Sequence, residues 1–439
     1  MFLSTAETGL PTRRDILATA ALTASPTIAW SSGDIAGEAL QLLDAQPHLR
    51  TGEPGEIAVA ELIRRVLAAA NFSVTEQKIT LSRFRMETRE ISWEGGATKV
   101  EVQAYPDQPS DRVISARSAL LRPGDHAGLA KGRIAVQVLP HKRHSQLLAR
   151  DLAPTIASVV EAKAAALVLV TEGPSGETVF LNLPAETKDL PNFPIAVVGP
   201  REAGELVEAA RDGRPMTLSV ADRSSTVSSN NVIGSVDRGT PYLIVSTPRT
   251  AWTPAVAERG PGLASFLELA TWAPTALPRT SLMFVSTTAH EYDNAGSQAF
   301  LNVHAPSGEE VGLWLHLGAG FGARDFHEFG GWRLQPLPGA DSQRFLVGSP
   351  ELLSSLKAAF RGQPGLENPY PASGGAAGEL EEILKKGYPR TLGLFGAHRF
   401  HHTMSDRLDK VSPSAIADVV TALKSVIQST FAAAPGRRA

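Results

Sequence analysis

A histidine and a glutamate stand side by side at His290 and Glu291, where an apolar stretch gives way to polar residues. An imidazole beside a carboxylate can bind a metal ion or carry a proton during a reaction. Residues 281–286, just before the pair, are mostly apolar and predict a buried parallel strand. Open α/β sheets place their chemistry at the carboxyl ends of such strands, so a reactive site is expected here. The alternative is a pair of solvated side chains at the end of a strand.

Strands and helices alternate along most of the chain. Apolar residues at helical spacing predict helices at 33–46, 55–70, 262–271, 294–304, 351–360 and 414–431. Apolar or alternating runs predict strands at 72–80, 242–246, 282–286, 311–317 and 391–394. This order predicts an α/β fold with a doubly wound, mixed and mostly parallel sheet.

The overall composition limits what the protein can be. A chain of 439 residues is too long for one ordinary core, so two domains are expected. Its 43% hydrophobic and 20% charged residues are typical of a soluble globular protein. The net charge of -3 gives no electrostatic reason to expect nucleic acid as a partner. The absence of cysteine excludes disulfides and thiolate zinc sites.

The start of the chain resembles a bacterial twin-arginine export signal. Arg13 and Arg14 precede an uncharged segment, 16–30, that is rich in Ala, Thr and Leu. At about fifteen residues the segment is too short to cross a bilayer as a helix. We therefore expect residues 1–32 to be a removable signal and the protein to be exported, to the periplasm or beyond. The alternative is a frayed helix with a chance pair of arginines.

The pattern of apolar residues and of Pro and Gly changes between residues 96 and 225. Strand-like runs at 133–138, 166–170 and 194–198 are separated by loops rich in Pro and Gly. The segments that carry a resemblance to the protease-associated domain are 131–136, 164–170 and 193–195. This resemblance implies a smaller, β-rich α/β domain inserted into the larger one. Such a domain lacks catalytic groups and shapes the access of substrate.

Four short segments resemble one family of enzymes. They are 231–234 (Asn-Val-Ile-Gly), 262–270, 296–297 (Gly-Ser) and 402–411 (His-Thr-Met-Ser-Asp-Arg-Leu-Asp-Lys-Val). Over about residues 36–432 the chain is similar to the co-catalytic di-zinc aminopeptidases and carboxypeptidases with an inserted protease-associated domain. Glutamate carboxypeptidase and the catalytically silent transferrin receptor are relatives. The resemblance implies a zinc-exopeptidase-like (phosphorylase/hydrolase-like) domain formed by residues 33–95 and 226–434.

The resemblance also implies that only part of the family's metal site is kept. The family's first His and Asp fall on Pro248 and Thr250, which offer neither an imidazole nor a carboxylate. Its bridging acid falls on Glu258, the second Glu of its acidic pair on Glu291, and its last His on His402. A set of two carboxylates and one imidazole would hold one zinc ion and leave a position open for water.

Two histidines take the places of family carboxylates. The family's base glutamate falls on His290, and its later aspartate falls on His316. In this hypothesis His290 is the base, and His316 is an auxiliary ligand or a partner of the oxyanion. The leading prediction is an exported, aminopeptidase-like hydrolase of peptide or amide bonds with a rebuilt, single-metal site and no membrane span.

Two other hypotheses remain open for the same residues. The chain could be a peptidase-like binding protein without catalysis, as the transferrin receptor is within this family. It could also use His290 and His316 for acid–base chemistry without any metal. In each case the expected partner is a peptide or a small amide.

Overall fold

The computed structural model describes residues 34–83, 88–102, 112–122, 125–141, 149–182, 193–220 and 225–432. The chain divides into two units, residues 1–34 and 35–439, and the description below concerns the second. The expected export signal at 1–32 therefore lies outside the described residues. Within the described ranges, every helix is too short or too polar to cross a membrane.

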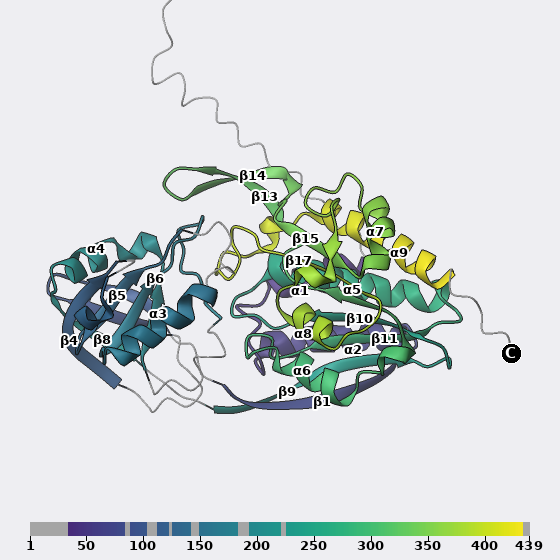
Figure 1. Ribbon diagram of the computed structural model, residues 1–439, viewed down its shortest axis with the longest axis horizontal. Coiled ribbons are helices and arrows are strands. Elements are labelled where there is room, and N and C mark those ends of the chain that lie inside the picture. The colour runs from purple at the N-terminus through teal and green to yellow at the C-terminus, as the bar shows by residue number, and fades with distance from the viewer. Residues whose placement is uncertain are drawn as a thin grey trace, which may run out of the picture. The chain divides into compact units, whose positions relative to one another are not determined.

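The larger domain is built on a mixed sheet of eight strands in the order β1-β9-β11-β10-β12-β17-β15-β16 (Figure 1). The strands are β1 (Ser73–Arg83), β9 (Ser225–Val236), β10 (Tyr242–Pro248), β11 (Ser281–Thr287), β12 (Val311–Leu317), β15 (Arg344–Gly348), β16 (Tyr370–Pro371) and β17 (Thr391–Gly396). The four central strands β11, β10, β12 and β17 run parallel. Strand β9 is antiparallel to both β1 and β11, and β15 is antiparallel to β17. The predicted α/β fold with a mixed sheet is confirmed.

Helices cover both faces of this sheet. They are α1 (Ile35–Asp44), α2 (Pro54–Ala69), α5 (Val256–Ala276), α6 (Ala295–Val303), α7 (Leu353–Ala359), α8 (Glu379–Lys385) and α9 (Pro413–Ala432). Successive residues of a strand point to opposite faces. Phe284 of β11 packs on Phe266 of α5, whereas its neighbour Val285 joins a core cluster with Phe300 of α6. Helices α5 and α6 therefore lie on opposite faces.

Helix α5 is buried on nearly every side, which is typical of a helix inside a core. It contacts α1, α2 and α9 as well as the sheet. A Cβ atom at Gly262 would lie 2.8 Å from Thr247 Oγ1 and 3.0 Å from the carbonyl oxygen of Leu317. Glycine at this position allows the helix to approach the ends of β10 and β12 closely.

The second domain is a closed barrel of seven strands in the order β2-β3-β7-β6-β5-β4-β8. Its strands are β2 (Thr88–Trp93), β3 (Gly96–Val102), β4 (Arg112–Leu121), β5 (Ile134–Val138), β6 (Ala166–Val170), β7 (Ile195–Val198) and β8 (Pro215–Val220), with helices α3 (Ala149–Glu161) and α4 (Pro200–Arg211). The predicted inserted domain is thus present as a barrel. Its first strand begins at Thr88, ahead of residue 96, and the division at 96–225 stays a prediction.

A hairpin of β13 (Arg324–Phe329) and β14 (Arg333–Ala340) forms a separate two-stranded sheet. Its turn includes Trp332, whose carbonyl oxygen accepts a hydrogen bond from Arg201 of α4 at 2.9 Å. Phe329 and Trp332 are 43% and 36% exposed. Most residues of the hairpin are exposed or only partly buried. The hairpin therefore lacks the alternation of buried and exposed residues from which strands are predicted.

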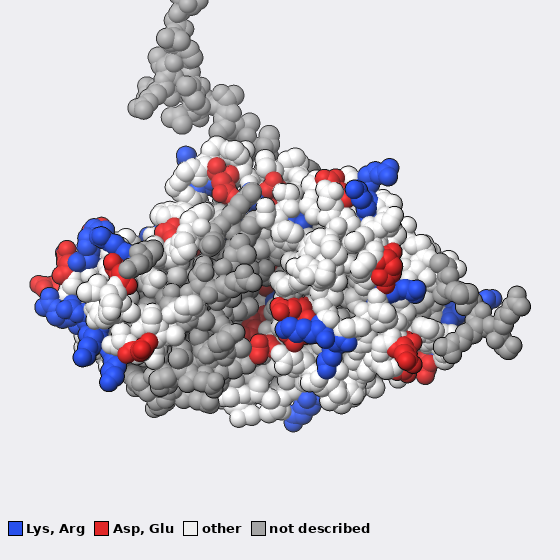
Figure 2. All heavy atoms as spheres, viewed as in Figure 1, with Lys and Arg blue, Asp and Glu red and all other residues white. Residues whose placement is uncertain are grey.

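Charged side chains of both signs are interspersed on the face shown in Figure 2. No broad patch of one sign is visible among the described residues on that face.

Candidate active site

The carboxyl ends of the parallel strands, the start of α5 and the loop before α9 meet in one place. Asp406 fixes the start of α5, because its carboxylate accepts hydrogen bonds from the backbone N–H of Ala257 at 2.7 Å and of Glu258 at 3.1 Å. An acidic side chain at a helix N-terminus satisfies amides that lack helical partners. Asp406 belongs to the segment 402–411 that carried much of the family resemblance, so this motif directly places Glu258.

Arg259 lies between the two carboxylates that were predicted to bind metal. Its Nη2 is 3.0 Å from Glu258 Oε1 and 3.0 Å from Glu291 Oε1, and its Nε donates to the carbonyl oxygen of Thr250 at 2.6 Å. All three ionic side chains are at most 2% exposed. A guanidinium keeps its charge at every physiological pH. The two buried carboxylates therefore share an internal cation.

The predicted ligand set of Glu258, Glu291 and His402 can be tested against this arrangement. Zinc lies about 2.0–2.2 Å from each carboxylate oxygen that binds it. An ion bound to both carboxylates would compete with Arg259 for the space between their oxygens. Arg259 thus occupies the space that an ion bound to both carboxylates would need, although both oxygens of Glu258 are buried without a hydrogen-bond partner among the described residues. The assignment of this ligand set stays a prediction.

A second set of donors lies beside the first. Glu258, His401 and His402 are buried, and one ligand atom of each lies within 4.8 Å of the others, a group that could hold a metal ion. However, the rings of His401 and His402 stack, with centroids 4.3 Å apart and 18° between their planes. The nitrogen lone pairs lie in the ring planes, and two stacked, nearly parallel planes do not meet close to the rings. The donor types suit zinc, but their directions do not converge on a tetrahedral ion.

His402 bridges the barrel and the larger domain. Its Nδ1 lies 2.8 Å from the carbonyl oxygen of Phe180, and its Nε2 lies 3.4 Å from Glu258 Oε1. Burial acts to lower the pKa of His402, but the carboxylate of Glu258 outweighs it and the pKa is raised. Burial acts to raise the pKa of Glu258, yet His401, Arg259 and His402 hold it well below its usual range. The two carboxylates and the guanidinium leave one formal negative charge, which a proton on His402 would cancel.

A further buried carboxylate, Glu379, lies next to His290. Glu379 Oε1 is 3.4 Å from His290 Nδ1, and both carboxylate oxygens lie 2.8 Å from the hydroxyl of Thr287. The backbone N–H of His290 donates to Thr250 Oγ1 at 3.0 Å. Burial acts to raise the pKa of Glu379, but His290 and His316 more than offset it, so the pKa is lowered. Sequence analysis missed Glu379, since its only local signal is an acidic start to a short helix.

His316 faces Ser246 on the neighbouring strand. Its Nδ1 is 3.0 Å from Ser246 Oγ, which also accepts a hydrogen bond from Trp314 Nε1 at 2.9 Å. Because Trp314 donates to that hydroxyl, the hydroxyl can donate to the ring nitrogen. Burial lowers the pKa of His316 to about 4, so the ring is neutral at pH 7. His316 is 2% exposed and thus out of reach of a bulky substrate in this arrangement.

An ion pair behind the site holds the ends of β10 and β11. Arg249 lies between Pro248 and Thr250 in the sequence, and its Nη2 donates to Glu56 Oε1 at 2.8 Å. Its Nη1 donates to the carbonyl oxygen of Ser286 at 2.9 Å. Both charged side chains are 1% exposed. The position after Pro248 thus carries a structural arginine.

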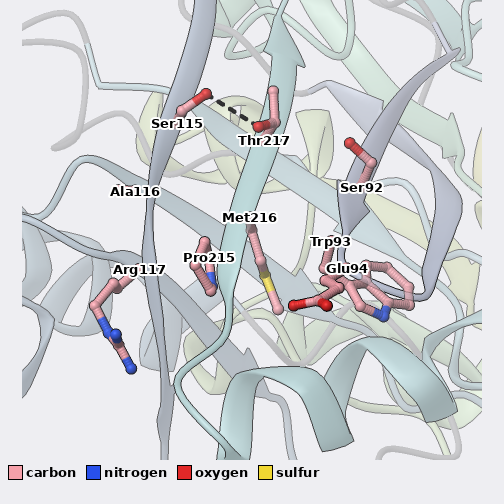
Figure 3. A pocket seen from close by; sticks show the side chains of 9 residues that line it. All are labelled: Ser92, Trp93, Glu94, Ser115, Ala116, Arg117, Pro215, Met216 and Thr217. Carbon is pink, nitrogen blue, oxygen red and sulfur yellow. Dashed lines mark hydrogen bonds between the residues drawn. The ribbon is translucent and has the colours of Figure 1, made fainter.

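The barrel has a cavity of its own, with a volume of about 390 Å³ (Figure 3). Trp93 and Glu94 lie on one side of it and Arg117 on the other, with Met216 between them. The lining residues come from β2, the turn after it, β4 and β8. This cavity does not include the ionisable cluster described above.

Comparison with known proteins gives a likeness in structure. No protein-family model matches the chain. No curated protein matches it either. The solved aminopeptidase from Aneurinibacillus sp. strain AM-1 matches with a TM-score of 0.63 and 16% identity, covering 91% of this chain and 94% of that one.

Two further solved structures are similar to this chain over about the same length. A zinc aminopeptidase from Bacillus subtilis has a TM-score of 0.67 and 15% identity, covering 90% of this chain and 94% of its own. A peptidase M28 precursor from Shewanella amazonensis SB2B has a TM-score of 0.70 and 16% identity, covering 90% of this chain and 93% of its own. Such low identity carries information about the fold alone. The chain has the α/β fold of the zinc aminopeptidases, a metallopeptidase-like hydrolase fold, together with an inserted seven-stranded barrel.

Proposed function

We propose that this chain binds peptides at the carboxyl ends of its sheet strands without using zinc. The observation that carries the proposal is the place of Arg259, whose Nη2 lies 3.0 Å from both Glu258 Oε1 and Glu291 Oε1. A divalent ion in the same cluster would sit beside a fixed positive charge, and like charges at short range repel strongly in a buried site.

The charge balance of the cluster supports the same proposal. The carboxylates of Glu258 and Glu291 are matched by Arg259 and by His402, whose raised pKa favours the imidazolium. Zinc binding to His402 would first require the loss of that proton. A zinc ion would therefore have to displace the guanidinium of Arg259 and any proton that His402 carries.

A peptide ligand is proposed because the structural relatives are aminopeptidases by name. In this proposal the fold keeps its task of recognising a short peptide, and the zinc-dependent cleavage is lost. The single-metal hydrolase expected from the sequence is the competing hypothesis.

Metal content and peptide binding should be measured on the same samples. After dialysis against zinc and removal of free metal, we expect no stoichiometric zinc in the wild-type chain. We also expect short peptides with a free amino terminus to bind in calorimetry with the same affinity in the presence of a chelator. Close to one zinc per chain, lost in Glu258→Gln and His402→Ala but kept in the exposed-site variant Glu61→Gln, would overturn the proposal, above all if peptides were cleaved only with zinc.

We also propose that the chain is exported through Arg13 and Arg14 and the uncharged segment after them. A fusion of residues 1–40 to a reporter should reach the periplasm of a bacterial host. The double variant Arg13→Lys, Arg14→Lys should stay in the cytoplasm, and equal export of both fusions would refute the proposal.

A further inference from the structure

We infer that His290 and Glu379 form a metal-independent general acid–base pair that hydrolyses short acyl esters, including aminoacyl esters, with a good leaving group. This inference goes beyond peptide binding and rests on the proposed absence of zinc from the site. It assigns an activity to two residues of which one, Glu379, has no counterpart among the family ligands carried over from the sequence.

The first support is the way Glu379 is held. Its carboxylate is 1% exposed and accepts from the hydroxyl of Thr287 at 2.8 Å, while Oε1 lies 3.4 Å from His290 Nδ1. A buried carboxylate at Nδ1 fixes the tautomer of an imidazole and stabilises the imidazolium that forms when Nε2 takes a proton. The pair therefore has the polarity that general-base chemistry requires.

The second support is the orientation of His290. Its backbone N–H donates to Thr250 Oγ1 at 3.0 Å, so the residue is held at both its backbone and its ring. The preceding residue, Ala289, has a positive φ of 56°, an uncommon conformation for a residue with a side chain. Such a backbone is kept only where the surroundings hold it, and it fixes the direction in which the next side chain leaves the strand.

The third support is access to the catalytic edge of the ring. The side chain of His290 is 13% exposed, more than Glu258, Arg259, Glu291, His402 or Glu379. A Cβ atom at Gly378 would lie 3.1 Å from His290 Cε1 and 3.8 Å from Nε2. Because residue 378 is glycine, with a φ of 62°, no side chain covers that edge from this side.

The reaction balances without any further reagent. His290 Nε2 accepts a proton from water as the water oxygen bonds to the acyl carbon, and the carbonyl electron pair moves to its oxygen. That pair then returns, the bond to the leaving oxygen breaks, and the imidazolium gives its proton to the leaving group. The net change is the addition of water across the ester bond, with Glu379 acting on the ring and never on the substrate.

The probe is an aminoacyl 4-nitrophenyl ester, followed by absorbance in the presence of a chelator. We expect His290→Gly to lower kcat by roughly 100-fold, the lower end of the range for a lost general base. Added imidazole should restore part of the rate, because it can enter the space the side chain left. Exposed histidines also react with such esters, so His304→Gly is the matched control and should leave the rate unchanged.

Glu379 is a positioning residue and needs its own readout. The variant Glu379→Gln keeps the shape and an acceptor for Thr287, and we expect it to lower kcat by about 10-fold while KM stays the same. Glu381→Gln, on the exposed side of the same helix, is the control. Imidazole should rescue His290→Gly much less well when it is combined with Glu379→Gln.

The outcomes separate this inference from the proposed function. A rate equal to wild type in both His290→Gly and the isosteric His290→Gln refutes the pair, and leaves peptide binding intact if calorimetry is unchanged. A rate abolished by chelator refutes the proposed function together with the pair. Thermal melting of each variant confirms that a lost rate does not come from a lost fold, and if His290→Gly does not fold, His290→Gln carries the decision.

Discussion

Arg259 Nη2 lies 3.0 Å from Glu291 Oε1, a contact between the start of a buried helix and the end of a central strand. The residues are 32 positions apart in the sequence. The same nitrogen contacts Glu258, the sequence neighbour of Arg259. One guanidinium therefore joins the two elements that carry the site, and several predictions can be tested at this joint.

Replacing Arg259 should destabilise the fold strongly. Arg259→Ala would leave Glu258 and Glu291 buried without the cation between them, a change that typically costs about 3–5 kcal/mol. Arg64→Ala is the control, because Arg64 is partly exposed and its pairs with Glu61 and Glu76 should contribute only about 0–1 kcal/mol. Denaturant unfolding measures both, and equal losses would contradict a central role for Arg259.

The same variant should gain an affinity for zinc. With the guanidinium removed, Glu258, Glu291 and His402 present two carboxylates and an imidazole to the space it filled. We expect zinc to raise the melting temperature of Arg259→Ala and to leave that of the wild type unchanged, since a ligand stabilises only the state that binds it. The double variant Arg259→Ala, His402→Ala should lose the effect. A zinc-induced shift in the wild type would show instead that Arg259 does not occupy the metal position.

Acid should destabilise the protein in part through His316. Burial lowers its pKa to about 4, below the value of 6.5 for an unperturbed histidine. Between these two pH values the unfolded chain binds a proton that the folded chain does not, so stability is complete above pH 6.5 and is lost as the pH falls towards 4. This group alone accounts for a loss of about 3 kcal/mol.

The variant His316→Asn keeps an acceptor for the Ser246 hydroxyl but has no group that titrates in this range. Its free energy of unfolding should fall less steeply than that of the wild type between pH 7 and pH 4. His304→Asn, at an exposed position, should follow the wild-type curve. Parallel curves for His316→Asn and wild type would mean that His316 does not contribute to acid sensitivity.

Glu56 should contribute strongly to stability, although it lies far in the sequence from His290 and Glu291. Its Oε1 accepts from Arg249 at 2.8 Å, Ser229 at 2.7 Å and Thr288 at 2.5 Å, and the side chain is 1% exposed. Glu56→Gln leaves Arg249 buried without its counter-ion, so we expect a loss of about 3–5 kcal/mol. Glu61→Gln on the same helix, with Glu61 69% exposed, should cost less than about 1 kcal/mol. Similar melting temperatures for the two variants would refute the difference.

The regular elements could be predicted because burial leaves a period in the sequence. The helix predicted at 414–431 is Pro413–Ala432, and the strand predicted at 311–317 is Val311–Leu317. The hairpin of β13 and β14 was missed because Phe329 and Trp332 are partly exposed and give no buried face. Periodicity reports which residues are buried, and this hairpin buries few.

The sequence predicted where the candidate site lies, at the ends of the strands, but not all the residues that form it. The family resemblance places Glu258, Glu291 and His402 near one another, but it says nothing about residues that are not ligands. In the sequence, Arg259 is one polar residue near the start of a mostly apolar helix. The orientation of its side chain towards Glu291 is set by tertiary packing, which no local pattern predicts. Glu379 lies 89 positions after His290, on a helix that no sequence motif connects to the strand.

The link between Phe180 and His402 makes the inserted barrel part of the site's own framework. The backbone N–H of Phe180 donates to the carbonyl oxygen of His402 at 2.9 Å, and its carbonyl oxygen lies 2.8 Å from the ring Nδ1. Both partners on the barrel side are main-chain atoms, which every amino acid at position 180 except proline would supply. The contact with His402 therefore does not depend on the side chain at position 180, which is buried in the core of the barrel and is constrained there instead. An insertion or deletion that shifts the backbone near Phe180 would misplace His402, so the site fixes the length of this segment while the barrel core fixes its apolar side chain.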